Sequence, residues 1–145
     1  MLDTNVIAEL TRAKPSPAVM SWAHAQPREA IFTTAVCEAE LLFGLAAMQD
    51  GRRRAALSRA IETMLDTVLS GRVLPFDRAA ARIYADLAAR GRAAGRPVGV
   101  ADLQIAAIAV ARNADAIATR NTAHFADCGI QVIDPWSTVP DRSGS

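Results

Sequence analysis

The sequence predicts an α/β domain in which a short central parallel sheet carries helices on both of its faces. Two observations support this prediction. Short β-branched or aromatic segments recur along the chain, and longer segments with a helical spacing of apolar residues lie between them. This alternation is typical of parallel strands joined by crossover helices. The length of 145 residues suits a single domain, and the 31 alanines favour its helices.

The first half of the chain supplies two short strands and four helical segments. The run at 31–34 is β-branched and aromatic, which is typical of a short buried strand. The helix after it is expected to bury the face that holds Val36, Glu40, Phe43 and Ala47. In order, we expect a strand at 1–2, a helix from residue 4, a short helix that Pro27 ends, a strand over 31–34, and helices over 35–48 and 52–69.

The second half repeats the alternation. Asp77 follows a strand-like run and can cap the next helix, because its carboxylate can accept hydrogen bonds from the free amides of the first turn. Residues after Trp136 have no apolar period, so we expect one domain over 1–137 and a loose tail over 138–145. In order, we expect a strand over 72–76, a helix to about residue 90, a loop over 91–99, a helix over 103–112, and strands over 116–119 and 130–133.

The composition excludes several classes of protein. The chain is 51% hydrophobic with a net charge of +1, whereas disordered chains combine few hydrophobic residues with a high net charge. Cys37 and Cys128 form no C-x-x-C pair, and neither His24, expected at the surface, nor His124, expected in a loop, completes a zinc site. The amino terminus has no signal pattern, and the most apolar stretch, 98–111, is shorter than the roughly 20 residues of a membrane span. We therefore expect a cytoplasmic protein without a membrane segment.

Polar residues fall where α/β sheets place their ligands, beyond the carboxyl ends of the strands. Asp3 and Asn121 directly follow predicted strands, and Asp102 lies at or near the start of a helix. Glu40 lies on a helix face with apolar neighbours, whereas Glu38 is rotated away from that face and is expected to be solvated. Taken singly, each aspartate can be a helix cap and the asparagine a turn residue.

Taken together, these residues favour a metal site over a set of independent caps. Carboxylates that lie close together repel one another and raise each other's pKa unless a cation compensates their charge. A hard ion with oxygen ligands, such as Mg²⁺ or Mn²⁺, would do so and would support hydrolysis of a phosphodiester.

Four motifs resemble a known family in their order and spacing. They are Leu2-Asp3-Thr4-Asn5-Val6, Glu40-Leu41-x-x-Gly44, Gly99-x-x-Asp102-x-x-Ile105-Ala106-Ala107 and Ala118-Thr119-Arg120-Asn121-x-x-x-Phe125. They resemble the PIN-domain ribonucleases, especially the VapC/FitB-type toxins of bacterial toxin–antitoxin pairs. The resemblance covers residues 1–137 and includes the lesser features Leu74-Pro75-Phe76-Asp77 and Asp134-Pro135-Trp136.

The resemblance implies a PIN fold, a Mg²⁺- or Mn²⁺-dependent endoribonuclease that leaves 5′-phosphate and 3′-hydroxyl ends, and a cognate antitoxin that neutralises it. It implies that Asp3, Glu40 and Asp102 bind the metal. Asn121 would complete the catalytic set at a position where the family usually has aspartate, which leaves one negative charge fewer for a second metal. Three neighbours would orient the carboxylates through hydrogen bonds: Thr4, Asn5 and Thr119.

Two other functions remain open at this point. Asp3 could be the phosphoryl-accepting nucleophile of a phosphatase of the haloacid-dehalogenase type, but that motif has a second acid where Asn5 stands, and the only lysine, Lys14, lies in the wrong region. Alternatively, the domain could bind RNA or an antitoxin without cleaving RNA, since Asn121 weakens the acid cluster.

The charge is unevenly distributed. Residues 51–100 carry a net charge of +6, whereas the segments before and after them are acidic. The arginines of this stretch are expected to be a solvated face or to hold an RNA backbone beside the acids; they include Arg52, Arg53, Arg54, Arg90, Arg92 and Arg96. The apolar helices over 35–48 and 52–69 are expected to supply a homodimer contact and a groove for an antitoxin helix.

Overall fold

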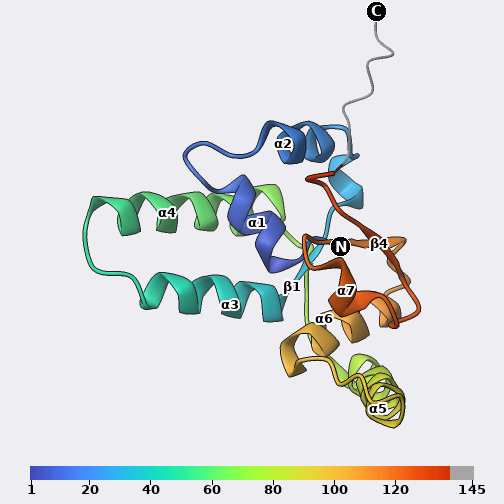
Figure 1. Cartoon of the computed structure of the whole chain (residues 1–145). Helices are drawn as coiled ribbons and strands as arrows, with labels where there is room; N and C mark the ends of the chain where they lie inside the picture. Colours follow the sequence, from blue (N-terminus) through green and yellow to red (C-terminus); the bar gives the residue numbers. More distant parts are fainter. Residues whose placement is uncertain (138–145) are drawn as a thin grey trace, which may run out of the picture.

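The structure is a computed structural model of the chain and describes residues 1–137. The expected alternation of helices and short strands is present (Figure 1). In order, the described elements are α1 (Thr4–Leu10), α2 (Pro17–His24), the 3₁₀ turn η1 (Arg28–Ala30), β1 (Thr33–Thr34), α3 (Ala35–Ala46), α4 (Arg52–Thr63), the π-helical turn η2 (Met64–Val68), β2 (Val73–Leu74), α5 (Arg78–Ala93), α6 (Val100–Ala111), β3 (Ala116–Ala118), α7 (Thr122–Phe125) and β4 (Gln131–Ile133).

The amino-terminal segment Met1–Asp3 forms the centre of the sheet. On one side, the Leu2 amide donates to the Phe32 carbonyl (2.7 Å), and on the other side the Asp3 amide donates to the Ala118 carbonyl (3.0 Å). β1 pairs in parallel with β2, β3 pairs in parallel with β4, and Leu2 forms a parallel bridge to Ala118. The order across the sheet is therefore β2, β1, Met1–Asp3, β3, β4.

This strand order reverses at Met1–Asp3. The chain passes first to β1 and β2 on one side and then to β3 and β4 on the other. Because crossovers between parallel strands are right-handed, the helices of the two halves cover opposite faces. Figure 1 shows α1 to α4 gathered apart from α5 to α7, as this requires. The predicted fold is confirmed, and Asp3 and Thr119 stand at the reversal point, where such sheets bind their ligands.

Helix α6 anchors the second face. Its residues Ile105–Ala109 are all fully buried. A helix that is apolar on every side belongs in the interior, and α5 packs along α6. The first turn of α6, which carries Asp102, is consequently fixed relative to the sheet.

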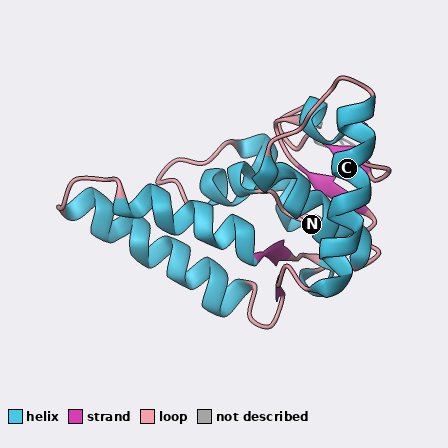
Figure 2. Cartoon of the chain, turned by 90° about the horizontal axis from the view of Figure 1, so that it is seen from below, coloured by secondary structure: helices cyan, strands magenta, loops and turns pink. Residues whose placement is uncertain are grey.

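Helices α3 and α4 form a hairpin that extends away from the sheet (Figure 2). The buried face of α3 consists of Cys37, Leu41 and Leu45, whereas Glu40 and Phe43 are exposed. The predicted buried face of this helix was therefore wrong. The helix carries two apolar stripes, and only the one with Cys37, Leu41 and Leu45 is buried, because the hairpin extends beyond the sheet. Glu38, expected to be solvated, is half-buried.

Several element boundaries also differ from the prediction. The strands expected over 31–34 and 72–76 are two residues long, because Thr34 already caps α3 by accepting a hydrogen bond from the Cys37 amide (3.0 Å). Asp77 caps α5 as predicted, accepting from the Ala80 amide (3.0 Å). The helix expected over 52–69 ends in the π-helical turn, and α6 begins before Asp102, which therefore lies within its first turn. The tail predicted over 138–145 lies outside the described residues.

No helix among residues 1–137 has the length and apolar character that crossing a membrane would need. Both cysteines are free and buried.

The central segment offers a test of the fold. Thr33 is fully buried, and its hydroxyl donates to the Leu2 carbonyl (2.9 Å). Thr33→Val preserves the shape but removes this donor, so it should lower the free energy of unfolding by about 1–3 kcal/mol. Urea denaturation followed by circular dichroism measures the change. Thr63→Val, at the exposed end of α4, is the matched control and should stay within about 0.5 kcal/mol of wild type; equal values for the two variants would contradict the role of the hydrogen bond.

Candidate metal-binding active site

Asp3 is the buried centre of the site, with 4% of its surface exposed. Its Oδ1 accepts a hydrogen bond from the Thr4 amide (2.8 Å) at the start of α1. Its Oδ2 accepts hydrogen bonds from the Thr119 hydroxyl (2.7 Å) and from Nδ2 of Asn5 (3.3 Å). Asp3 therefore caps α1, which the sequence had left open, but the cap uses only one of its two carboxylate oxygens.

Thr119 ties the end of β3 to this carboxylate. Besides donating to Asp3, its Oγ1 accepts hydrogen bonds from Nδ2 of Asn5 (3.2 Å) and from the Asn121 amide (3.0 Å). Oδ1 of Asn5 in turn accepts from the Arg120 amide (3.1 Å). The structure thus brings together Asn5 and Thr119, both predicted to be orienting groups, around Asp3.

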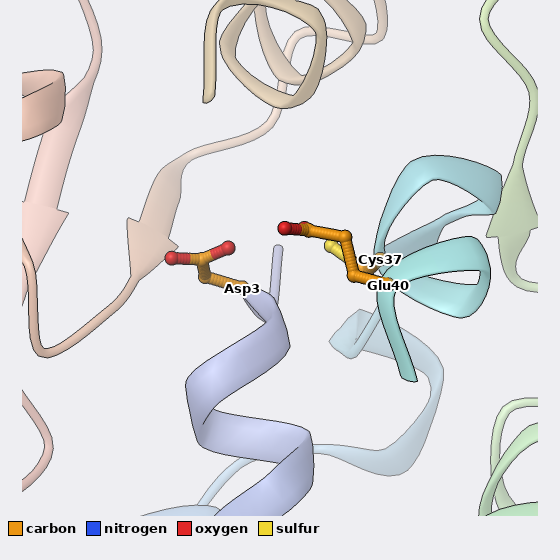
Figure 3. Close-up of side chains that lie close together, drawn as sticks. All are labelled: Asp3, Cys37 and Glu40. Carbon is orange, nitrogen blue, oxygen red and sulfur yellow. The ribbon is translucent and has the colours of Figure 1, made fainter. Parts of the chain in front are cut away.

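Glu40 lies on α3, and its side chain contacts the first residue of α1. Although the residue is exposed, its Oε1 accepts a hydrogen bond from the Thr4 hydroxyl (2.6 Å). Figure 3 shows the Glu40 and Asp3 side chains together with Cys37. One potential ligand atom from each of these three residues lies within 4.8 Å of the others.

Cys37 belongs to the core beneath the site. Its Sγ accepts a hydrogen bond from the Thr34 hydroxyl (3.2 Å) and donates to the Leu2 carbonyl (3.7 Å). Burial raises the pKa of the Cys37 thiol and keeps it protonated. A protonated thiol does not bind a hard cation, so the potential ligands are the carboxylate oxygens.

Asp102 is half-buried in the first turn of α6, and its Oδ2 lies 2.8 Å from Nδ1 of His124. It is not part of the 4.8 Å group of Asp3, Cys37 and Glu40, although its charge acts on Asp3. His124, expected in a loop, lies in α7. Sequence reasoning missed this residue, although its position one helical turn after Asn121, beyond a strand end, could have indicated it.

The Asp3 carboxylate is in an unfavourable environment for its charge. Burial raises the pKa of Asp3 most, and the charges of Asp102 and Glu40 raise it further, while the hydrogen bonds from Thr119 and Thr4 lower it. Within residues 1–137, none of the groups that donate hydrogen bonds to Asp3 is basic. A cation bound among these acids would relieve the repulsion, so the donor set fits a hard divalent ion.

Asn121 joins the hydrogen-bond network around Asp3 through its backbone amide. Its amide donates to Thr119, and the residue is exposed where α7 begins. The neighbouring Arg120 lies over the ring of Trp136, with 5.0 Å from the guanidinium carbon to the ring centroid.

The arginines of the middle segment do not form one surface. Arg52–Arg54 lie at the start of α4, at the far end of the α3–α4 hairpin, whereas Arg90 and Arg92 lie near the end of α5 (Figure 1). Arg96 follows in the loop before α6 and lines a cavity of about 460 Å³ together with Asp102. Of these six arginines, only Arg96 shares a cavity with one of the acids, Asp102.

Comparisons with known proteins identify the family of the chain. The family model of the PIN domain matches residues 1–129. The chain is 47% identical to the VapC ribonuclease Y4jK of Sinorhizobium fredii over 94% of this chain and 96% of that protein. The crystal structure of FitAcB from Neisseria gonorrhoeae is similar with a TM-score of 0.83 and 34% identity, covering 94% of this chain and 98% of that one.

A third similar protein is a solved member of the VapBC family of toxin–antitoxin systems, VapBC-5 from Mycobacterium tuberculosis. It has a TM-score of 0.62 and 29% identity, and the match covers 91% of this chain and 93% of that one. These similarities favour a PIN-domain nuclease over the phosphatase alternative. By the family match, by the identity to a VapC ribonuclease and by the shared parallel fold, the chain belongs to the PIN-domain family.

Proposed function

We propose that this protein is a Mg²⁺- or Mn²⁺-dependent endoribonuclease and the toxin of a toxin–antitoxin pair. The observation that supports this best is the buried Asp3 carboxylate, which has the charges of Glu40 and Asp102 nearby and only hydroxyl and amide donors around it. A bound cation would compensate the charge of this carboxylate. The similarity to a VapC ribonuclease indicates that the substrate is RNA.

Asp3, Glu40 and Asp102 would hold the ion through carboxylate oxygens, the ligands that Mg²⁺ prefers. When bound, the ion supplies Lewis-acid stabilisation of phosphate charge and lowers the pKa of a bound water. The neutral amide of Asn121 adds no charge at the fourth position, which favours binding of one ion over two.

The residues around the acids hold them in place before substrate arrives. Thr119 and Asn5 fix one oxygen of Asp3, and the Thr4 hydroxyl fixes Glu40. Because these donors are part of α1 and the end of β3, the acids need little reorganisation during the reaction. Hydrolysis then adds a water oxygen to phosphorus, breaks the bond to the 3′ oxygen and leaves a 5′-phosphate and a 3′-hydroxyl; the water loses a proton and the leaving oxygen gains one.

A groove beside the acids suits an antitoxin. It has a volume of about 510 Å³ and lies between α1, α3 and α4, with Thr4 and Glu40 in its lining. Apolar side chains form much of its wall: Leu41, Leu45, Met48, Leu57 and Ile61. An amphipathic antitoxin helix would fill it with spaced apolar anchors and place a basic side chain against the acids. On α3, Leu42 (47% exposed) and Phe43 (77%) support a homodimer contact.

The acids provide the main test of the proposed activity. Asp3→Asn and Asp102→Asn should each lower the cleavage rate of a pool of single-stranded RNA oligonucleotides by at least about a hundredfold, because each removes charge that holds the cation. Gel analysis of end-labelled RNA measures the rate, and Asp86→Asn on the exposed surface of α5 is the matched control. Wild-type protein that binds RNA but leaves it intact with Mg²⁺ and with Mn²⁺ would favour the non-catalytic binding module instead.

Metal binding has a readout that does not depend on RNA. Mg²⁺ at ten times its Kd should stabilise the folded protein by about 1.4 kcal/mol, which corresponds to about 3–6 °C in Tm for a domain of this size. Differential scanning calorimetry with and without EDTA measures the shift. Asp3→Asn should abolish it; a shift of equal size in that variant would place the ion elsewhere.

The arginines can be compared with an internal control. Arg90 and Arg92 lie in the last turn of α5, close in sequence to Arg96, which lines the cavity of Asp102. Changing all three to Gln should therefore reduce the salt dependence of RNA binding by about 0.7 in the slope of log K against log[salt] for each RNA phosphate that the variant no longer neutralises. The same change at Arg52, Arg53 and Arg54 removes equal charge at the far end of the hairpin and should leave the slope near wild type. Equal effects of the two triple variants, measured by fluorescence anisotropy, would contradict this assignment.

A further inference from the structure

One short segment of the chain contacts two of the acids. At its start, the Thr119 hydroxyl donates to Oδ2 of Asp3 (2.7 Å), and near its end Nδ1 of His124 lies 2.8 Å from Oδ2 of Asp102. Asp3 comes from the centre of the sheet and Asp102 from α6, so these two acids share no secondary-structure element. Residues 119–124 therefore bridge them.

The bridging segment is held at both ends. The Asn121 amide donates to Thr119 (3.0 Å), and the His124 amide donates to the Asn121 carbonyl (3.1 Å). Phe125, directly after the histidine, is fully buried. These contacts fix the backbone from which the imidazole reaches Asp102.

The contact between His124 and Asp102 does little for the fold. The two side chains are 52% and 26% exposed, and exposed polar pairs contribute little to stability. At 2.8 Å, Nδ1 of His124 and Oδ2 of Asp102 must be joined by a hydrogen bond, because two facing lone pairs would repel each other. Nδ1 carries that proton in the imidazolium and in one neutral tautomer, so the contact needs no particular charge on the ring.

We propose that His124 is a positioning residue for the nuclease site, which holds the Asp102 carboxylate in the orientation needed to bind the divalent ion. This rests on the proposed function and adds to it a residue outside the predicted acid set. Groups that hydrogen-bond a metal-binding carboxylate or histidine typically change metal affinity by about 10- to 100-fold when they are removed. His124 would therefore act on ion affinity more than on the chemical step.

The experiment compares three variants. His124→Ala removes the contact, His124→Asn keeps an N–H donor at a position close to Nδ1, and His24→Ala removes the other histidine of the chain, which is exposed at the end of α2. For each we would measure the Mg²⁺ concentration that gives half of the thermal stabilisation without RNA, and separately the Mg²⁺ dependence of RNA cleavage. Circular dichroism and the Tm in EDTA report on the fold.

We expect the half-saturating Mg²⁺ concentration of His124→Ala to rise about tenfold or more, with an unchanged Tm in EDTA and with cleavage largely restored at saturating Mg²⁺. His124→Asn and His24→Ala should stay within about twofold of wild type. An unchanged or lower half-saturating concentration in His124→Ala, while wild type binds Mg²⁺ and cleaves RNA, would overturn the positioning role alone. Wild-type protein that neither binds Mg²⁺ nor cleaves RNA would overturn the proposed function and this inference with it.

Discussion

The hydrogen bond between the Thr119 hydroxyl and the Asp3 carboxylate joins the fold to the site. It links the two strand ends at which the order of the sheet reverses, and it does so at a buried position where an unpaired carboxylate would be costly. Nδ2 of Asn5 donates to both Asp3 and Thr119, and the Asn121 amide also donates to Thr119. The Arg120 amide in turn donates to Oδ1 of Asn5. The reversal point of the sheet is thus also the place where the chain concentrates its polar interactions.

The acids oppose the stability of the domain that carries them. Burial raises the pKa of Asp3 most, and the charges of Asp102 and Glu40 raise it further. Hydrogen bonds from hydroxyls and amides offset this rise only in part. Independent helix caps would not need such an arrangement, because a cap is stable with one exposed carboxylate, as Asp77 is on α5. This contrast distinguishes Asp3, which we propose to bind the metal, from Asp77, which serves as a helix cap.

The sequence was sufficient for the fold class and for the placing of Asp3 and Thr119, since short apolar strands and their carboxyl ends are local features. The sequence was insufficient where tertiary packing decides which of two similar faces of a helix is buried, or which distant residues come into contact. Helix α3 has two apolar stripes, and its sequence does not say which one meets α1, so Glu40 was expected on the buried face. His124 was missed because its partner Asp102 lies 22 positions earlier on another helix.

The exposure of Glu40 follows from the same geometry and suits its role. A glutamate on the buried stripe of α3, beside Leu41, would be surrounded by the core and would have no path to a substrate. From the exposed stripe, its longer side chain reaches the Thr4 hydroxyl while the surface above remains open to solvent. The proposed site therefore combines one carboxylate fixed in the interior, Asp3, with the half-buried Asp102 and the exposed Glu40. A phosphate of the proposed RNA substrate could approach from the exposed side without opening the core.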